Sequence, residues 1–257
     1  MSYTGFIKGL SGFLKGIDSP AVLEVGVDLG QSAFPLVHNL CYNHHEFLFE
    51  GVDISLKGWL SDSMSQLDGV NATTIKCNDS SGYFKGEPFK EFNVRFYETN
   101  SLSFLPEAVS CGKKYDLILL DGDHNYYTVY RELQSISHLC HSSTLIICDD
   151  FNGKHSKNDL FYSERPEYKD VKNATEKIVS KKTGVQNAIM DFVEDDSKDW
   201  HGHCIESQGR ILEPVILYQS SFIDLKTIDN GNDNSSNLDI VVTPLSSCAE
   251  KRFKTKV

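Results

Sequence analysis

Two short apolar runs in the sequence each end on a pair of carboxylates, and these acids are the first candidates for chemistry. The run LILL leads into Asp121 and Asp123, and the run LIIC leads into Asp149 and Asp150. One predicted helix separates the runs, so we expect neighbouring parallel strands about 4.8 Å apart. The acids would then converge at one edge of a buried sheet, where they repel one another unless a proton, water or a cation intervenes.

A hard divalent cation would relieve that repulsion. Mg²⁺ prefers an all-oxygen environment, keeps several of its waters and accepts substrate oxygens. The pattern therefore predicts a Mg²⁺ site formed by Asp121, Asp149 and Asp150. The alternative is that these acids cap the following helices and accept hydrogen bonds from backbone N–H groups. One Asp per strand end would suit that role well, and three at this spacing fit it less well.

A glycine turn follows the first predicted strand, in the pattern Glu24-x-Gly26-x-x-x-Gly30. It is not G-x-G-x-x-G, because Asp28 occupies the place of the middle glycine, so a pyrophosphate cradle is disfavoured. An acid ahead of the glycines suits a cationic ligand group better than a phosphate. Asp53 ends the next strand, where an acid can accept hydrogen bonds from both hydroxyls of a ribose. The alternative is a glycine turn needed only for close packing of a strand against a helix.

The order of elements predicts the fold class. Strands alternate with helices, and the strands are apolar without alternation, which indicates a mostly parallel sheet covered on both faces. We therefore expect a doubly wound α/β domain. Past the carboxylates we expect a long loop, a helix near Val171–Lys182 and later strands. The segments expected to form these strands are Val185–Phe192, Pro214–Gln219 and Leu238–Leu245. His201-Gly-His203 lacks a third metal ligand, so a loop is favoured there.

We expect one domain over residues 1–257. Its parts would be an N-terminal helix (1–18), a cofactor-binding core (19–150), an active-site loop (151–170) and a C-terminal part of the sheet with a tail (171–257).

The N-terminal helix has one apolar face, formed by Phe6, Leu10, Phe13, Leu14 and Ile17. A membrane-surface helix would carry more basic residues on its polar face. We therefore expect this face to pack on its own domain or on a partner subunit. The second arrangement would make the protein a homo-oligomer.

The amino-acid composition limits the classes of molecule that the protein could bind. A net charge of −11 argues against binding a nucleic-acid backbone, because phosphate binding needs a basic face. Seven cysteines show no paired spacing, as is typical of a reducing compartment. We find no signal-peptide pattern and no apolar run long enough to span a membrane. The expectation is a cytoplasmic enzyme or binding protein without a membrane span.

The E-x-G-x-x-x-G turn with Asp53 resembles the class I S-adenosylmethionine-dependent methyltransferases. The resemblance implies a seven-stranded, Rossmann-like methyltransferase sheet. It also implies that the glycine turn passes the methionine part of S-adenosyl-L-methionine and that Asp53 binds the ribose. Asn100 and Ser101 lie where that family contacts adenine, and Asp121 joins the cofactor-binding residues at the same edge. Many members of the family have an acid at the place of Asn100.

A second motif narrows the resemblance. The stretches LLDGDHNYYTVYREL and TLIICDDF are similar to those of the metal-dependent small-molecule and sugar O-methyltransferases related to macrocin O-methyltransferase (methyltransferase family 24 type). Cephalosporin-hydroxylase-type proteins share this motif, and catechol O-methyltransferase has a similar strand-end metal site. The resemblance covers roughly residues 21–150. It implies that Asp121, Asp149 and Asp150 hold the metal.

The same resemblance assigns Asp123 as the general base. Asp123 lies two residues past Asp121, after a glycine that lets the backbone turn, so its carboxylate can face the substrate rather than the metal. His124 follows it at the start of a helix and is the alternative base.

Together these features predict an S-adenosylmethionine-dependent, Mg²⁺-dependent O-methyltransferase that acts on a hydroxyl of a sugar or another small molecule. Two alternatives stay open. One is a metal-independent N-methyltransferase, and the other is a non-catalytic protein that binds the cofactor and regulates or scaffolds a partner.

Overall fold

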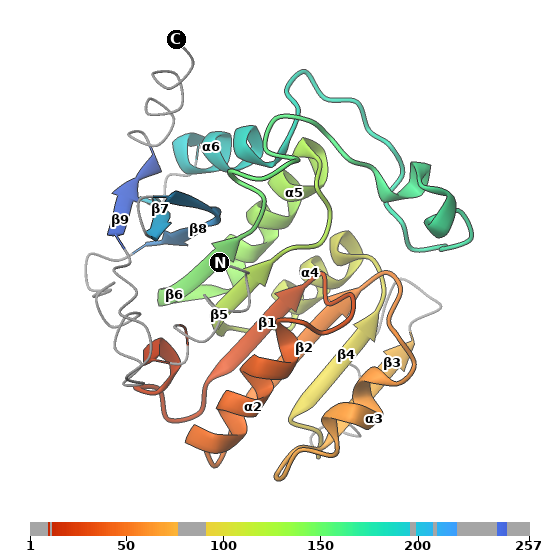
Figure 1. The fold of residues 1–257 in the computed structure, drawn as a ribbon, viewed down its shortest axis with the longest axis vertical. Helices are drawn as coiled ribbons and strands as arrows, with labels where there is room; N and C mark the ends of the chain where they lie inside the picture. Colours follow the sequence, from red (N-terminus) through yellow and green to blue (C-terminus); the bar gives the residue numbers. More distant parts are fainter. Residues whose placement is uncertain are drawn as a thin grey trace.

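A computed structural model describes residues 10, 12–76, 91–195, 199–207, 210–219 and 241–245. In this part of the chain one nine-stranded sheet has the order β3-β4-β2-β1-β5-β6-β8-β7-β9 (Figure 1). The strands from β3 to β6 in this order pair in parallel, and those beyond β6 pair antiparallel. The strands are β1 (Ala21–Val25), β2 (Leu48–Asp53), β3 (Ala72–Lys76), β4 (Val94–Glu98), β5 (Tyr115–Leu120), β6 (Cys140–Cys148), β7 (His201–Ser207), β8 (Arg210–Tyr218) and β9 (Val241–Pro244).

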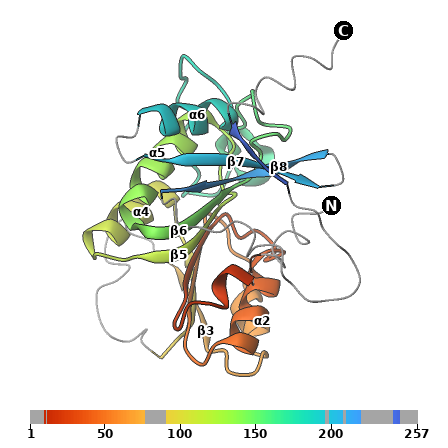
Figure 2. The ribbon, with the colours of Figure 1, turned by 90° about the vertical axis from the view of Figure 1, so that its left-hand side faces the viewer.

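Helices cover both faces of the sheet (Figure 2). One apolar core contains residues of α4, α5 and α6, and a second core contains residues of α2 and α3. Strand β1 contributes to both, because Leu23 packs in the first core and Val22 in the second. The predicted doubly wound α/β class is therefore confirmed. The helices are α2 (Ala33–Asn43), α3 (Leu60–Met64), α4 (Ser101–Ser110), α5 (Tyr126–Ile136) and α6 (Val185–Asp195), with 3₁₀ turns η1 (Ser137–Leu139), η2 (Tyr162–Glu164) and η3 (Pro166–Tyr168).

Helix α5 shows why the two carboxylate-ended strands become neighbours. Asn125 caps its start by accepting a hydrogen bond from Thr128 N at 2.9 Å. Val129, Leu133 and Ile136 then recur at helical spacing and are buried against the sheet. The helix thus returns the chain from β5 to β6, and Leu120 pairs with Cys148 in parallel register.

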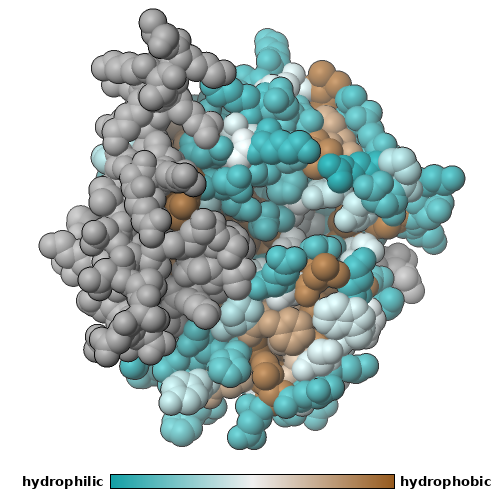
Figure 3. All heavy atoms as spheres, in the orientation of Figure 1, coloured by the Kyte–Doolittle hydropathy of each residue, from teal (hydrophilic) through white to brown (hydrophobic). Residues whose placement is uncertain are grey.

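The described part of the N-terminal segment packs on its own domain. Residues 12–14 are helical, Leu10 and Leu14 are fully buried, and Phe13 and Ile17 pack against the same core. Phe6 lies outside the described residues. In the described ranges no helix combines the length and apolar content that crossing a membrane requires. Figure 3 shows mainly hydrophilic side chains on the described surface of this face, with smaller apolar groups between them.

Two expectations after the carboxylates were wrong. Residues 171–182 form no helix, and Val185–Phe192 belongs to helix α6 rather than to a strand. The buried residues of α6 are Val185, Ala188, Ile189 and Phe192, which is a helical period. The short apolar stretch allowed both assignments, and packing of α6 against α5 and the sheet decides for the helix.

The strand count also differs from the expected seven. Part of the long stretch after Asp53 forms β3, an extra parallel strand at one edge of the sheet. At the other edge, His201 and His203 lie in strand β7 rather than in a loop. β8 includes the expected strand near Pro214, and β9 lies within the expected strand Leu238–Leu245. Pairing of β7 with both β8 and β9 makes the sheet nine-stranded in the described residues.

The strand order places a topological switch point beside β1. From β1 the chain continues to β2 on one side, whereas β5 pairs with β1 on the other side. In open parallel sheets ligands bind beyond the carboxyl ends of the strands at this point. The glycine turn, Asp53 and Asp121 all follow strands that end there.

Candidate active site

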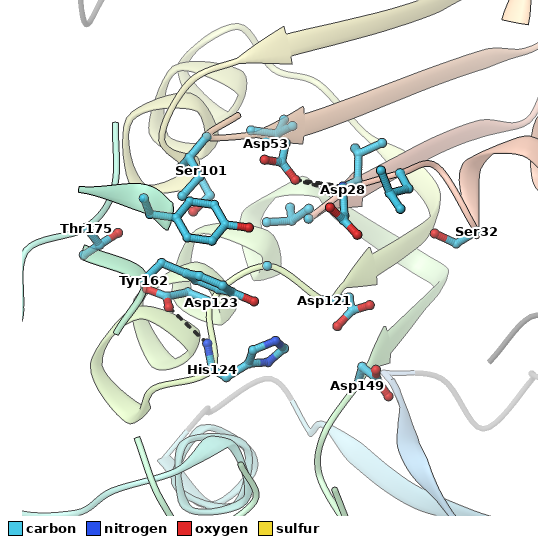
Figure 4. A pocket seen from close by; sticks show the side chains of 18 of the residues that line it. Asp28, Ser32, Asp53, Ser101, Asp121, Asp123, His124, Asp149, Tyr162 and Thr175 are labelled. Carbon is cyan, nitrogen blue, oxygen red and sulfur yellow. Dashed lines mark hydrogen bonds between the residues drawn. The ribbon is translucent and has the colours of Figure 1, made fainter. Parts of the chain in front are cut away.

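A cavity of about 440 Å³ lies beyond the carboxyl ends of β1, β2 and β5 (Figure 4). Seven of the residues predicted from sequence line it: Gly26, Asp53, Ser101, Asp121, Asp123, His124 and Asp149. Four predicted residues do not line it: Glu24, Gly30, Asn100 and Asp150. The structure therefore brings most of the predicted site together, and it places the remaining residues in a layer behind or beside it.

Asp53 holds the glycine turn in place. Its Oδ2 accepts hydrogen bonds from Val27 N and Asp28 N, both at 2.9 Å, and its Oδ1 accepts one from Ser55 N at 2.8 Å. Burial raises the pKa of Asp53, and the three N–H donors oppose that rise. Asp28, at the place of the middle glycine, has a φ of 43°, so the turn keeps a left-handed residue there.

Glu24 lies beneath the glycine turn and is fully buried. Ser32 Oγ donates a hydrogen bond to its Oε1, and its Oε2 has no hydrogen-bond partner. Burial raises the pKa of Glu24 to about 8, because the charged form would lose its hydration. Glu24 is therefore neutral at pH 7, and it supports the turn rather than facing the cavity. Its predicted contact with a cofactor stays a prediction.

Asp121 and Asp149 lie side by side on the neighbouring ends of β5 and β6 (Figure 4). Burial raises the pKa of Asp121 well above its usual range, and the negative charge of Asp149 raises it further. Burial also raises the pKa of Asp149, to about 6. A hydrogen bond between the two carboxyls raises the pKa of Asp121 and lowers that of Asp149. In the described ranges neither forms an ion pair with a lysine or arginine.

Asp150 turns away from this pair. Its φ is 55°, and its Oδ2 lies 3.3 Å from Nδ1 of His124. Burial lowers the pKa of His124 to about 4, an effect that Asp150 partly opposes. His124 also stacks on His155, with ring centroids 5.3 Å apart. Among the described residues no three His, Cys, Asp or Glu side chains are already arranged as a metal site.

Asp123 faces the cavity at the start of the α5 segment. Its Oδ1 accepts a hydrogen bond from His124 N at 3.1 Å, and its Oδ2 accepts one from Thr128 Oγ1 at 2.9 Å. Burial raises the pKa of Asp123 to about 6, and these donors limit the rise. A carboxylate with this pKa is mostly ionised at pH 7 and is more basic than an exposed aspartate.

Asn100 and Ser101 have different surroundings. Asn100 caps α4 through Leu102 N at 2.8 Å, and its Nδ2 donates to Asn173 O at 2.7 Å and to Thr175 Oγ1 at 3.0 Å. Ser101 lines the cavity, and its Oγ donates to the buried carboxyl of Glu132 at 2.5 Å. Burial raises the pKa of Glu132 to about 8.

The cavity-lining residues that sequence reasoning missed include four that follow β6 in the chain: Tyr162, Arg165, Tyr168 and Thr175. They belong to residues 151–184, which run from β6 to α6 and which we call the covering segment (Figure 1). The rings of Tyr162 and Tyr168 pack edge to face with centroids 4.8 Å apart, and Tyr162 lies 5.9 Å from the His124 ring. The sequence predicted an active-site loop in this region, but no residue spacing in the loop indicated which of its side chains would line the cavity.

A family model described as a methyltransferase domain matches residues 23–151, half of the chain. The chain belongs to this methyltransferase family. The matched residues include Asp53 and all four strand-end aspartates. The protein is an S-adenosylmethionine-dependent methyltransferase of the class I type. No curated protein matches it in sequence.

Solved structures share the fold of this methyltransferase at low sequence identity. CalS11, described as a TDP-rhamnose 3'-O-methyltransferase of calicheamicin biosynthesis, has a TM-score of 0.50 and 12% identity over 84% of this chain and 79% of that one. TomG from Streptomyces achromogenes, in complex with SAM, has a TM-score of 0.48 and 12% identity over 86% and 81%. The O-methyltransferase from Bacillus cereus, in complex with SAH, has a TM-score of 0.47 and 13% sequence identity over 84% of this chain and 80% of that one. The likeness to CalS11 shows the fold alone.

We predict that the neutral state of Glu24 makes the stability of this methyltransferase pH-dependent. Its folded-state pKa, about 8, lies above the ordinary value of 4.5, so this carboxyl contributes stability fully below pH 4.5. The contribution is lost as pH rises through about 8. Glu24→Gln cannot ionise, so its free energy of unfolding should rise relative to wild type by up to about 1.4 kcal/mol per pH unit in this window.

Urea unfolding of both proteins from pH 5 to pH 9 measures that difference, with Glu46→Gln as a control at a surface site. Parallel pH curves for wild type and Glu24→Gln would show that Glu24 is already ionised in the folded protein at neutral pH.

Proposed function

We propose that this methyltransferase transfers the methyl group of S-adenosylmethionine to a hydroxyl of a small-molecule acceptor, a sugar or another polyol. The observation that carries the proposal is the carboxylate of Asp123. It faces the cavity with a raised pKa of about 6, beside the acidic pair at the ends of β5 and β6. A hydroxyl is a poor nucleophile until its proton is accepted, and Asp123 is suited to accept it.

The cofactor would lie along the glycine turn. Asp53 is available to the ribose there, because Oδ1 accepts only the Ser55 N–H among the described residues and each carboxylate oxygen can accept two hydrogen bonds. The sulfonium of the cofactor is cationic, and the acidic lining of the cavity favours such a group. Ser101 lines the same cavity, and adenine would extend toward it.

The acidic pair fits a Mg²⁺ ion in its chemistry. Asp121 and Asp149 are two largely buried carboxyls that form no ion pair with a lysine or arginine in the described residues, so a divalent cation would compensate their charge. Mg²⁺ often binds through one or two carboxylates and keeps its remaining waters. We propose Asp121 and Asp149 as direct ligands. Asp150 would complete the predicted set by exchanging its contact with His124 for the ion.

The ion would supply Lewis acidity, which lowers the pKa of a hydroxyl bound to it. The chain's own residues do the rest. The acceptor oxygen would attack the sulfonium methyl in line as the methyl–sulfur bond breaks, with S-adenosylhomocysteine as the leaving group. Asp123 would take the hydroxyl proton, and Thr128 with the His124 N–H holds that carboxylate in position. The lowered pKa of His124 makes its side chain a weaker base than Asp123 at neutral pH.

The first prediction tests the cofactor. Asp53→Ala should weaken S-adenosylmethionine binding by roughly 1–3 kcal/mol, because a charged hydrogen-bond acceptor is lost and the glycine turn is released. Isothermal titration calorimetry measures the dissociation constant, and Asp62→Ala, at an exposed acid of α3, serves as the control. Binding of NAD in place of S-adenosylmethionine would contradict the proposed function.

The second prediction tests the metal by binding as well as by activity. Asp149→Asn should weaken Mn²⁺ binding, followed by electron paramagnetic resonance, by at least about tenfold. S-adenosylhomocysteine affinity should change little, and Asp62→Asn should bind Mn²⁺ as wild type does. Excess chelator should abolish methyl transfer to a panel of sugars and polyols. Full turnover in chelator would leave these acids a capping role and favour metal-independent transfer.

The third prediction separates Asp123 from His124. Asp123→Asn should lower kcat by roughly 10²–10⁴-fold while cofactor and Mn²⁺ binding persist, because only the proton acceptor is removed. His124→Asn should have a much smaller effect. Transfer of methyl from labelled S-adenosylmethionine measures both variants. If the two effects are reversed, His124 is the base and Asp123 serves only to order the turn before α5.

A further inference from the structure

One arginine stands out in the charge pattern of the cavity. In the part of the chain that the structure describes, Arg165 is the only lysine or arginine that lines the cavity. The acids that line it are Asp28, Asp53, Asp121, Asp123 and Asp149. The cationic groups of the cofactor account for the acids, whereas a guanidinium calls for an anionic partner.

Among the described residues, the guanidinium of Arg165 forms its ion pair with Glu167 and not with those acids. Its Nη1 lies 3.5 Å from Glu167 Oε1, in a pair whose side chains are 37% and 58% exposed, so the contact is weak. The same group lies over the Tyr162 ring, 5.7 Å from its centroid. A guanidinium has five N–H donors, and these contacts leave most of them available to a ligand.

The backbone fixes the position of Arg165. It lies between η2 and η3, where its N–H donates to Tyr162 O at 2.9 Å and its carbonyl accepts from Tyr168 N at 3.0 Å. The covering segment is tied to the sheet domain on both sides of this point. Leu160 N donates to His124 O at 2.9 Å, and Asn100 holds Thr175. The backbone at Arg165 is thus held in place by contacts within the protein itself.

Arg165 belongs to the acceptor end of the cavity. Its guanidinium lies over the ring of Tyr162, and the centroid of that ring is 5.9 Å from the centroid of His124, the residue that follows Asp123. A planar guanidinium binds a carboxylate or a phosphate through two parallel charge-assisted hydrogen bonds. Such a contact would both hold and orient a small acceptor.

We propose that Arg165 binds an anionic group of the acceptor, a carboxylate or a phosphate, and so places the acceptor hydroxyl against Asp123. This inference rests on the proposed function and narrows it. The acceptor class becomes hydroxyl compounds that carry a negative charge, such as sugar acids or sugar phosphates, rather than neutral polyols.

Anion titrations test the proposal on the full chain. Inorganic phosphate and acetate are titrated into ¹⁵N-labelled protein, with and without saturating S-adenosylhomocysteine, while the arginine Nε–H signals are followed by NMR. One arginine signal should shift saturably in the millimolar range with the cofactor product present. Arg165→Gln should abolish the shift, and Lys169→Gln, which removes the same charge from an exposed position of the same segment, should keep it. The tighter of the two anions identifies the group.

Two results would overturn the assignment. The first is no saturable shift up to about 100 mM of either anion, which corresponds to a binding free energy too small for recognition. The second is loss of anion binding when S-adenosylhomocysteine is added, together with an approximately tenfold or greater loss of its affinity in Arg165→Gln, which would assign Arg165 to the cofactor's own carboxylate. Failure of wild-type protein to bind S-adenosylhomocysteine is a separate result and would reject the proposed function itself.

Discussion

The arrangement of the site depends on one close backbone contact, between Gly26 and the end of β5. A Cβ on Gly26 would lie 2.2 Å from the carbonyl oxygen of Asp121, and the glycine has a φ of 89° that other residues rarely adopt. Gly26 N donates to Val52 O, and Asp121 N donates to Val25 O, both at 2.8 Å. Three strand ends are thereby joined at one point, with carboxylates on either side of it.

Carboxylates gathered at this point repel one another, and the fold reduces the repulsion differently for each of them. Asp53 accepts hydrogen bonds from three backbone N–H groups, whereas burial raises the pKa of Glu24 to about 8 in the layer beneath. Burial raises the pKa values of Asp121 and Asp149, whose carboxyls share a hydrogen bond. The site is therefore prepared for positive charge in two places, at the glycine turn and at the ends of β5 and β6. A cationic cofactor and a divalent ion would each use one of them.

The core of the sheet could be predicted from the sequence, because each apolar run indicates a buried strand and the acid after it marks the end of that strand at the ligand-binding edge. That is why the convergence of Asp121 and Asp149 was predicted correctly from β5 and β6. Short segments were harder, because the eight-residue stretch that became part of α6 carries apolar residues compatible with either a strand or a helix. The covering segment has no periodicity at all, so its packing depends on contacts between residues far apart in sequence. Arg165 and Tyr162 therefore could not be placed.

Asn100 shows how the two parts of the site are joined. The resemblance assigned it to adenine, but its side chain is already engaged on both sides: Oδ1 caps α4, and Nδ2 holds Asn173 and Thr175. An acid at this position could cap the helix but could not donate to the covering segment. The amide in place of the acid thus fits a chain whose cavity is completed by that segment. The sheet carries the glycine turn and the acids of the cavity, the covering segment supplies Arg165, and Asn100 ties one to the other.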